Sequence, residues 1–208
     1  MNVTKAKPKE VVIASLKGKR RVFIFGCKDC ATLCKTGGEE QVLNWKKYLE
    51  ESGFEVTGTA IPDSTCDKRL IRKIFREKEK EIFDADVILL LACGSGFASV
   101  AEIIELPVVT ALDTLFVGVT EKIGSFYERC SLCGDCMLND TAGLCVMTRC
   151  AKGFVNGPCG GAINGKCEVN QEDDCFWIML KKKSKDSLLF TKYIPPRNTP
   201  RIIRRRKD

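Results

Sequence analysis

Apolar and polar positions alternate along the first half of the chain in two different rhythms. Residues 22–25 form an uninterrupted apolar run, which predicts a buried strand. Residues 39–51 instead repeat apolar side chains at Val42, Trp45 and Leu49, the spacing of one face of a helix. The pattern therefore predicts a strand followed by a helix that covers it.

The same two rhythms continue along the chain. Short β-rich or apolar runs at residues 54–60, 87–92 and 107–112 predict three more strands. Between them, residues 67–83 have a period close to 3.6 residues and predict a helix. Strands that alternate with helices form mainly parallel sheets. We therefore expect an α/β domain over residues 21–125, with a doubly wound, mainly parallel sheet of the flavodoxin-like or Rossmann-like kind.

The rest of the chain has a different character. Residues 126–178 contain many glycines, few apolar residues in periodic order, and a cysteine every few positions. Such a segment resembles small metal domains, which are ordered by what they bind, so we expect an irregular cysteine-rich domain without an apolar core of its own. Residues 1–20 are expected to be an N-terminal extension, and residues 179–208 a basic C-terminal tail.

The composition limits the chemistry that the chain can perform. Its 208 residues include thirteen cysteines and no histidine, which excludes Rieske centres, haem held by histidine, and mixed Cys/His zinc sites. The longest apolar run, residues 87–93, is too short to cross a bilayer, so we expect a soluble, cytoplasmic protein. Because the cytosol keeps thiols reduced, and because the cysteine count is odd, a disulfide framework is disfavoured.

The formal net charge of +7 treats every cysteine as neutral. Three oxidised [4Fe–4S] clusters with four thiolates each carry about −2 apiece, which would leave a total of roughly +1. The charge is therefore a weak argument for nucleic acid binding.

The first group of cysteines follows the geometry of an open parallel sheet. Cys27, Cys30 and Cys34 form a Cys-x2-Cys-x3-Cys run after the first predicted strand, and Cys93 ends the third. Ligands in such sheets bind outside the carboxyl ends of the strands, and a flavodoxin-like order makes these two strands neighbours. We therefore predict one four-thiolate iron–sulfur site, for which Cys66, after the second strand, is the rival fourth ligand.

Three glycines beside this group are candidates for contact with the cofactor. Gly37 and Gly38 would let the backbone approach closely, just before a helix whose N-terminal dipole favours an anion. Gly94 follows Cys93 and could donate its N–H group to a sulfur atom. Two alternatives stay open for this site: a zinc ion held by four thiolates, and an open cluster held only by the first three cysteines, in which case the chain would itself be an enzyme.

The second group contains eight cysteines, enough for two complete four-thiolate sites. Cys130, Cys133 and Cys136 form a Cys-x2-Cys-x2-Cys run, the beginning of a bacterial ferredoxin ligand set. By analogy with two-cluster ferredoxins, these three are expected to take a more distant partner, and the spacing leaves that partner open. Zinc ribbons are the competing explanation. The other cysteines are Cys145, Cys150, Cys159, Cys167 and Cys175.

Several strings in this segment resemble a known family. They are the run from 130 to 136, Thr-Ala-Gly-Leu-Cys at 141–145, Asn-Gly-Pro-Cys-Gly-Gly at 156–161, and the segment 165–177, together with residues 26–38 of the first half. The chain resembles the methylenetetrahydrofolate reductase C-terminal domain family, the small iron–sulfur subunit of the reductase in acetogenic and related anaerobic bacteria. The resemblance covers residues 20–178, although Val146 stands where the family pattern has Pro.

The resemblance implies a partner protein. The family's companion is a TIM-barrel subunit that binds FMN or FAD and reduces methylenetetrahydrofolate to methyltetrahydrofolate in one-carbon metabolism of the Wood–Ljungdahl type. This chain would then be a non-catalytic electron-transfer and assembly subunit with about three [4Fe–4S] clusters, and further redox subunits or ferredoxin would be additional partners. The lack of histidine and of an acid–base constellation agrees with that role.

The alternative is a zinc-stabilised adaptor. Its four-cysteine sites would be structural, and its basic tail would bind a partner or nucleic acid through the run Arg204-Arg205-Arg206-Lys207.

Overall fold

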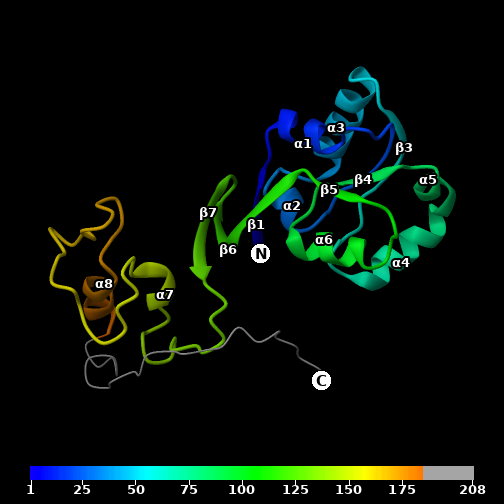
Figure 1. The fold of residues 1–208 in the computed structure, drawn as a ribbon. Helices are drawn as coiled ribbons and strands as arrows, with labels where there is room; N and C mark the ends of the chain where they lie inside the picture. Colours follow the sequence, from blue (N-terminus) through cyan, green and yellow to red (C-terminus); the bar gives the residue numbers. More distant parts are fainter. Residues whose placement is uncertain (185–208) are drawn as a thin grey trace. The chain divides into compact units, whose positions relative to one another are not determined.

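The computed structural model describes residues 1–184 and contains two compact units (Figure 1). The first unit comprises residues 1–128, and the second begins at Arg129. The expected basic tail, residues 179–208, begins within helix α8 (Phe176–Lys183), and the part from residue 185 onward, with its run at residues 204–207, lies outside the described residues. Within the described residues, no helix is long and apolar enough to cross a membrane.

A parallel four-stranded sheet forms the centre of the first unit. Its strand order is β3-β2-β4-β5, and β2 pairs in parallel with both β3 and β4. The predicted mainly parallel sheet is thus confirmed, and the strands that precede the first cysteine run and Cys93 are direct neighbours. The bounds are β2 Arg21–Phe25, β3 Glu55–Ala60, β4 Val87–Leu90 and β5 Val108–Thr110.

Helices cover both faces of this sheet (Figure 1). Because successive side chains of a strand point to opposite faces, β2 and β4 contribute alternate residues to two separate cores. Burying one large apolar side chain stabilises the fold by about 1.5–3 kcal/mol. One core joins Val22, Ile24, Val87 and Leu89 to α1 (Lys9–Ser15) and α3 (Glu39–Glu51). The other joins Phe23, Phe25, Ile88 and Leu90 to α4 (Lys68–Glu77), α5 (Glu79–Phe83) and α6 (Gly94–Ala101).

The helix predicted over residues 67–83 is in fact two helices. Asp67 caps α4 by accepting a hydrogen bond from the backbone N–H of Arg69 at 2.9 Å. At Lys78 the backbone leaves the helical region, with φ −121° and ψ 26°, and α5 begins at Glu79. A periodic apolar pattern continues across such a break, so it did not reveal it.

A second sheet of the first unit was not predicted. It is antiparallel, with the order β1-β6-β7, where β1 is Asn2–Ala6, β6 is Leu112–Lys122 and β7 is Ser125–Cys130. β1 pairs with β6 from Asn2 opposite Val117 to Ala6 opposite Leu112. Residues 1–20, expected to be an extension, therefore contain a paired strand and a packed helix.

The second unit has a small apolar core, contrary to expectation. As far as residue 184, its helices are α7 (Val146–Arg149) and α8 (Phe176–Lys183), and they are joined by turns and short bridges. The indole N–H of Trp177 donates to the carbonyl of Phe154 at 3.2 Å. The core consists of Met137, Leu144, Val146, Phe176, Trp177 and Leu180, with Cys150 and Cys175 among the partly buried residues packed against it.

Candidate cysteine sites

The first cysteine group lies at the carboxyl end of the parallel sheet. Cys27 follows β2, Cys30 begins the short helix α2 (Cys30–Leu33), Cys34 ends it, and Cys93 precedes α6 after β4. Cys27 and Cys93 are buried, whereas Cys30 and Cys34 are half-buried. We call this place the crevice site.

The loop that carries the first three cysteines is held against the end of β4. The N–H of Cys27 donates to the carbonyl of Gly37 at 2.8 Å, and the Thr32 hydroxyl donates to the carbonyl of Cys27 at 2.7 Å. A Cβ atom on Gly37 would lie 1.9 Å from the carbonyl oxygen of Leu91. The close approach predicted for Gly37 is therefore explained by backbone packing on β4.

The other two glycines use their N–H groups within the protein. Gly38 donates to the side-chain oxygen of Gln41 at 3.1 Å, which satisfies the first turn of α3. Gly94 donates to the hydroxyl of Thr114 at 2.9 Å. The N–H groups of Gly38 and Gly94 therefore donate to protein side chains. The N–H groups that donate to sulfur atoms of the crevice site belong to another residue.

That residue is Asn2, at the start of β1. Its backbone N–H donates to the sulfur of Cys30 at 3.4 Å, and its side-chain amide donates to the sulfur of Cys93 at 3.2 Å. The thiol of Cys34 donates to the carbonyl of Asn2 at 3.9 Å. Asn2 therefore joins three of the four crevice cysteines, a role for which the sequence holds no signal.

The thiol of Cys30 has a raised pKa. Burial is the largest cause, and it is partly opposed by the hydrogen bond from Asn2; Asp29 and Cys93 act in the same direction as burial. Cys93 thus belongs to the electrostatic surroundings of Cys30. The rival, Cys66, is exposed, and its sulfur lies 3.1 Å from the hydroxyl of Ser64.

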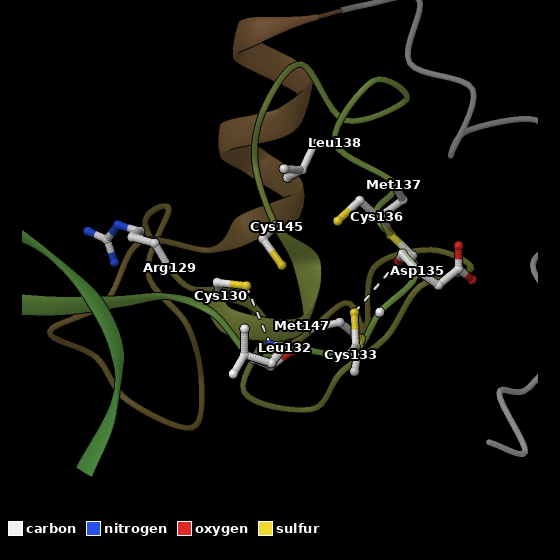
Figure 2. Close-up of a pocket in the computed structure, with 12 residues that line it drawn as sticks. Arg129, Cys130, Leu132, Cys133, Asp135, Cys136, Met137, Leu138, Cys145 and Met147 are labelled. Carbon is white, nitrogen blue, oxygen red and sulfur yellow. Dashed lines mark hydrogen bonds between the residues drawn. The ribbon is translucent and has the colours of Figure 1, made fainter. Parts of the chain in front are cut away.

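Four cysteines of the second unit surround one cavity. Figure 2 shows the sulfur atoms of Cys130, Cys133, Cys136 and Cys145 pointing toward a common space. The cavity has a volume of about 430 Å³. We call it the cysteine cavity, and its lining also includes Leu132, Met137, Leu138 and Met147.

Tight turns shape this cavity, and one arginine is part of its lining. Leu132, at φ 54°, and Gly134, at φ 82°, reverse the chain between successive cysteines, and the backbone N–H of Leu132 donates to the sulfur of Cys130 at 3.4 Å. Arg129 lines the cavity. The pKa of Arg149 is lowered, mainly because the side chain is partly buried and secondly because it lies near the positive charge of Arg129. Cys145 has the opposite effect and raises this pKa. The charge of Arg149 therefore acts on one of the cavity cysteines, Cys145.

The remaining four cysteines occupy two kinds of surroundings. Cys150 and Cys175 pack against the small apolar core. The thiol of Cys159 donates to the carboxylate of Glu168 at 3.3 Å, and Glu168 also pairs with Lys152. This pairing is the main cause of two pKa shifts: it raises the pKa of Lys152 and lowers the pKa of Glu168. Cys159 and Cys167 also help to raise the pKa of Lys152.

No tight single-ion site is formed among residues 1–184, where no group of three or more histidine, cysteine, aspartate or glutamate side chains is arranged to hold a metal ion. The cysteine cavity is a space between sulfur atoms rather than a point on which they converge.

The fold and these sites define a mixed α/β protein with a parallel sheet, an antiparallel sheet and a cysteine-rich C-terminal unit. Residues 109–199 match the family described as Methylene-tetrahydrofolate reductase C terminal. None of the curated proteins compared with the chain matches it. The resemblance drawn from the cysteine strings is confirmed for this part, which includes all eight cysteines of the second group, whereas residues 20–108 lie outside the match.

Proposed function

We propose that this chain is the iron–sulfur electron-transfer and assembly subunit of a methylenetetrahydrofolate reductase. The observation that carries the proposal is the cysteine cavity, where four thiols face one space in the part of the chain that is similar to the reductase family. About three [4Fe–4S] clusters are proposed, one in this cavity, one on the remaining cysteines of the second unit and one at the crevice site.

The cavity fits a cluster better than a zinc ion. Zinc–sulfur bonds are about 2.3 Å long, so four thiolates must converge on a single point. Sulfur atoms around a cavity of about 430 Å³ leave room for inorganic iron and sulfide. Leu132, Met137 and Leu138 would keep water from the cluster, and Arg149, whose charge acts on Cys145, would offset part of its negative charge.

The ligand sets of the three sites are part of the proposal. When bound, the clusters supply one-electron redox chemistry. Cys145 is proposed as the fourth ligand of the cavity, which leaves a complete set for the second cluster. The second set is Cys150, Cys159, Cys167 and Cys175, and the crevice set is Cys27, Cys30, Cys34 and Cys93.

The proposed partner is a flavin-containing reductase subunit, with FMN or FAD bound there and not in this chain. Support comes from the family similarity and from a cysteine inventory suited to carrying electrons rather than to acid–base catalysis. Further redox subunits or ferredoxin would exchange electrons with the same clusters.

The test is anaerobic purification followed by iron, sulfide and zinc analysis. We expect about twelve iron atoms and as many acid-labile sulfides per chain, four for each of about three clusters. One zinc per site without sulfide would contradict the proposal and favour the zinc-stabilised adaptor. Mixing the reduced chain with a flavin-bearing methylenetetrahydrofolate reductase subunit in a stopped-flow experiment should then reduce the flavin, and an unchanged flavin spectrum would contradict the electron-transfer role.

A further inference from the structure

β1 brings one residue against three of the four crevice cysteines. Asn2 donates from its backbone to Cys30 and from its side chain to Cys93, and its carbonyl accepts from Cys34. These contacts use three different groups of one residue. We infer that Asn2 is a positioning residue of the crevice site, which orients the sulfur atoms of Cys30 and Cys93 through its two N–H groups and raises the reduction potential of the cluster that they hold. The effect on the reduction potential rests on the proposed function, because it requires a cluster at the crevice site.

The position of Asn2 is set by contacts that do not involve sulfur. Asn2 and Val3 pair with Val117 and Phe116 of β6, and the side chain of Val3 is buried. On the other side, the buried hydroxyl of Thr4 lies 2.6 Å from that of Thr36, at the end of the cysteine loop. β1 is therefore tied both to β6 and to the loop that carries the ligands, so its donors are in place before any cofactor binds.

The sign of the effect follows from charge. An N–H group that points at a thiolate favours the more negative state of the cluster, and reduction adds one negative charge. Hydrogen bonds to the sulfur atoms are among the factors that set cluster potentials. The two N–H groups of Asn2 therefore raise the potential, and removal of either one lowers it.

The experiment is a redox titration of the anaerobic, cluster-loaded full chain, followed by electron paramagnetic resonance. The crevice signal is the one that disappears in Cys93→Ser. Asn2→Asp keeps the size of the side chain but replaces the donor to Cys93 with a carboxylate. We expect the ratio of reduced to oxidised crevice cluster at a fixed potential to fall about tenfold, which is about 59 mV for one electron.

Two further variants and two controls separate positioning from general damage. Asn2→Ala should shift the ratio in the same direction but less, because it removes the donor to Cys93 without adding a negative charge beside the cluster. Asn2→Gln, which keeps the amide, should recover part of the shift. Lys5→Ala on β1 and Asn44→Asp on α3, both exposed, should leave the potential unchanged. Iron content should stay equal in all of these variants.

The outcomes distinguish the two proposals. If Cys93→Ser removes a signal but Asn2→Asp leaves its potential unchanged, the role of Asn2 is wrong and the crevice cluster stands. If Cys93→Ser changes neither iron content nor any signal, Cys93 is not a ligand, and both the crevice cluster in its four-cysteine form and the role of Asn2 are wrong. If Lys5→Ala lowers the potential as much as Asn2→Asp, the effect belongs to β1 as a whole, which contradicts the specific role of Asn2.

Discussion

The two units of this chain support their cysteines in opposite ways. In the first unit, the cysteines lie on loops at the end of a sheet that is covered by apolar cores on both faces. In the second unit, eight cysteines are distributed over turns around a core of six buried side chains. In small scaffolds, an apolar core rarely supplies more than about 3–5 kcal/mol, and disulfides, bound metals or oligomerisation supply the rest. The first unit is thus expected to keep its shape without a cofactor, and the second is not.

Removal of the metal should give the largest difference between the units. Anaerobic chelation is expected to unfold the second unit and leave the first folded, because metal binding and folding are coupled where the core is small. The chain's two tryptophans, Trp45 and Trp177, lie in different units and are both buried. Fluorescence of the variants Trp45→Phe and Trp177→Phe, combined with limited proteolysis, would follow each unit separately. Equal resistance of both units to chelation would show that the comparison is wrong.

Loss of one ligand should remove one cluster. Cys145→Ser is expected to lower the iron content from about twelve to about eight atoms per chain, because the cavity would lose its fourth thiolate. Cys66→Ser, at an exposed cysteine outside both groups, is the matched control and should keep the full content. If Cys145→Ser keeps all the iron and the Cys150→Ser variant does not, the division of the eight cysteines proposed above is wrong.

Core substitutions sharpen the comparison further. Leu89 in β4 and Leu180 in α8 are both fully buried, with 0% of the residue exposed. Leu89→Ala should lower the unfolding free energy of the first unit by about 2–5 kcal/mol, whether or not metal is bound. Leu180→Ala should have a smaller effect in the metal-loaded protein than after chelation, since metal–ligand bonds also hold its unit. Urea titrations monitored at Trp45 or Trp177 would measure both effects, and a metal-independent effect at Leu180 would contradict this account.

The smallest expected effect concerns pH and the first unit alone. Asp86 accepts hydrogen bonds from the backbone N–H groups of Arg20 and Arg21 and from the Arg21 guanidinium, which lower its pKa from 3.8 to about 2. A carboxyl group whose pKa is lowered by folding stabilises the fold above pH 3.8, and that contribution is lost as the pH falls toward 2.

Asp86→Asn should therefore make the stability of the first unit less dependent on pH in that window. Unfolding monitored at Trp45 from pH 5 down to about pH 2 measures the slope across this window. Asp84→Asn, an exposed position two residues away, controls for the loss of a charge. An unchanged slope in Asp86→Asn would mean that this carboxylate does not contribute.

The elements that could be predicted from sequence are those whose apolar pattern directly reflects which of their side chains are buried. Strands such as β2 and β4 are uninterrupted apolar runs, and α3 was predicted with its observed bounds, Glu39–Glu51, because Val42, Trp45 and Leu49 face one core. Their order then explained why the first three cysteines and Cys93 share one end of the sheet.

The features that were missed depend on contacts between distant residues. β6 and β7 carry exposed apolar side chains at Leu115, Val119 and Tyr127, so they lack the apolar-in, polar-out alternation of a half-buried strand. Asn2 acts through a strand pairing that brings it beside Cys93, 91 residues away. The link between Cys145 and the run that begins at Cys130 likewise depends on the path of the chain, which spacing alone does not determine.

The connection between the two sheets is so short that it limits where the chain can be cut into fragments. Only Ala111 separates β5 from β6, so the region similar to the reductase family, which begins at residue 109, starts inside the parallel sheet. A fragment cut there would strip the sheet of an edge strand and leave β1 without its partner, with unpaired backbone groups open to aggregation. The division into compact units falls after Glu128 instead, within the last residues of β7, so the stretch that is similar to the family and the compact unit that carries its cysteines begin at different places in the chain.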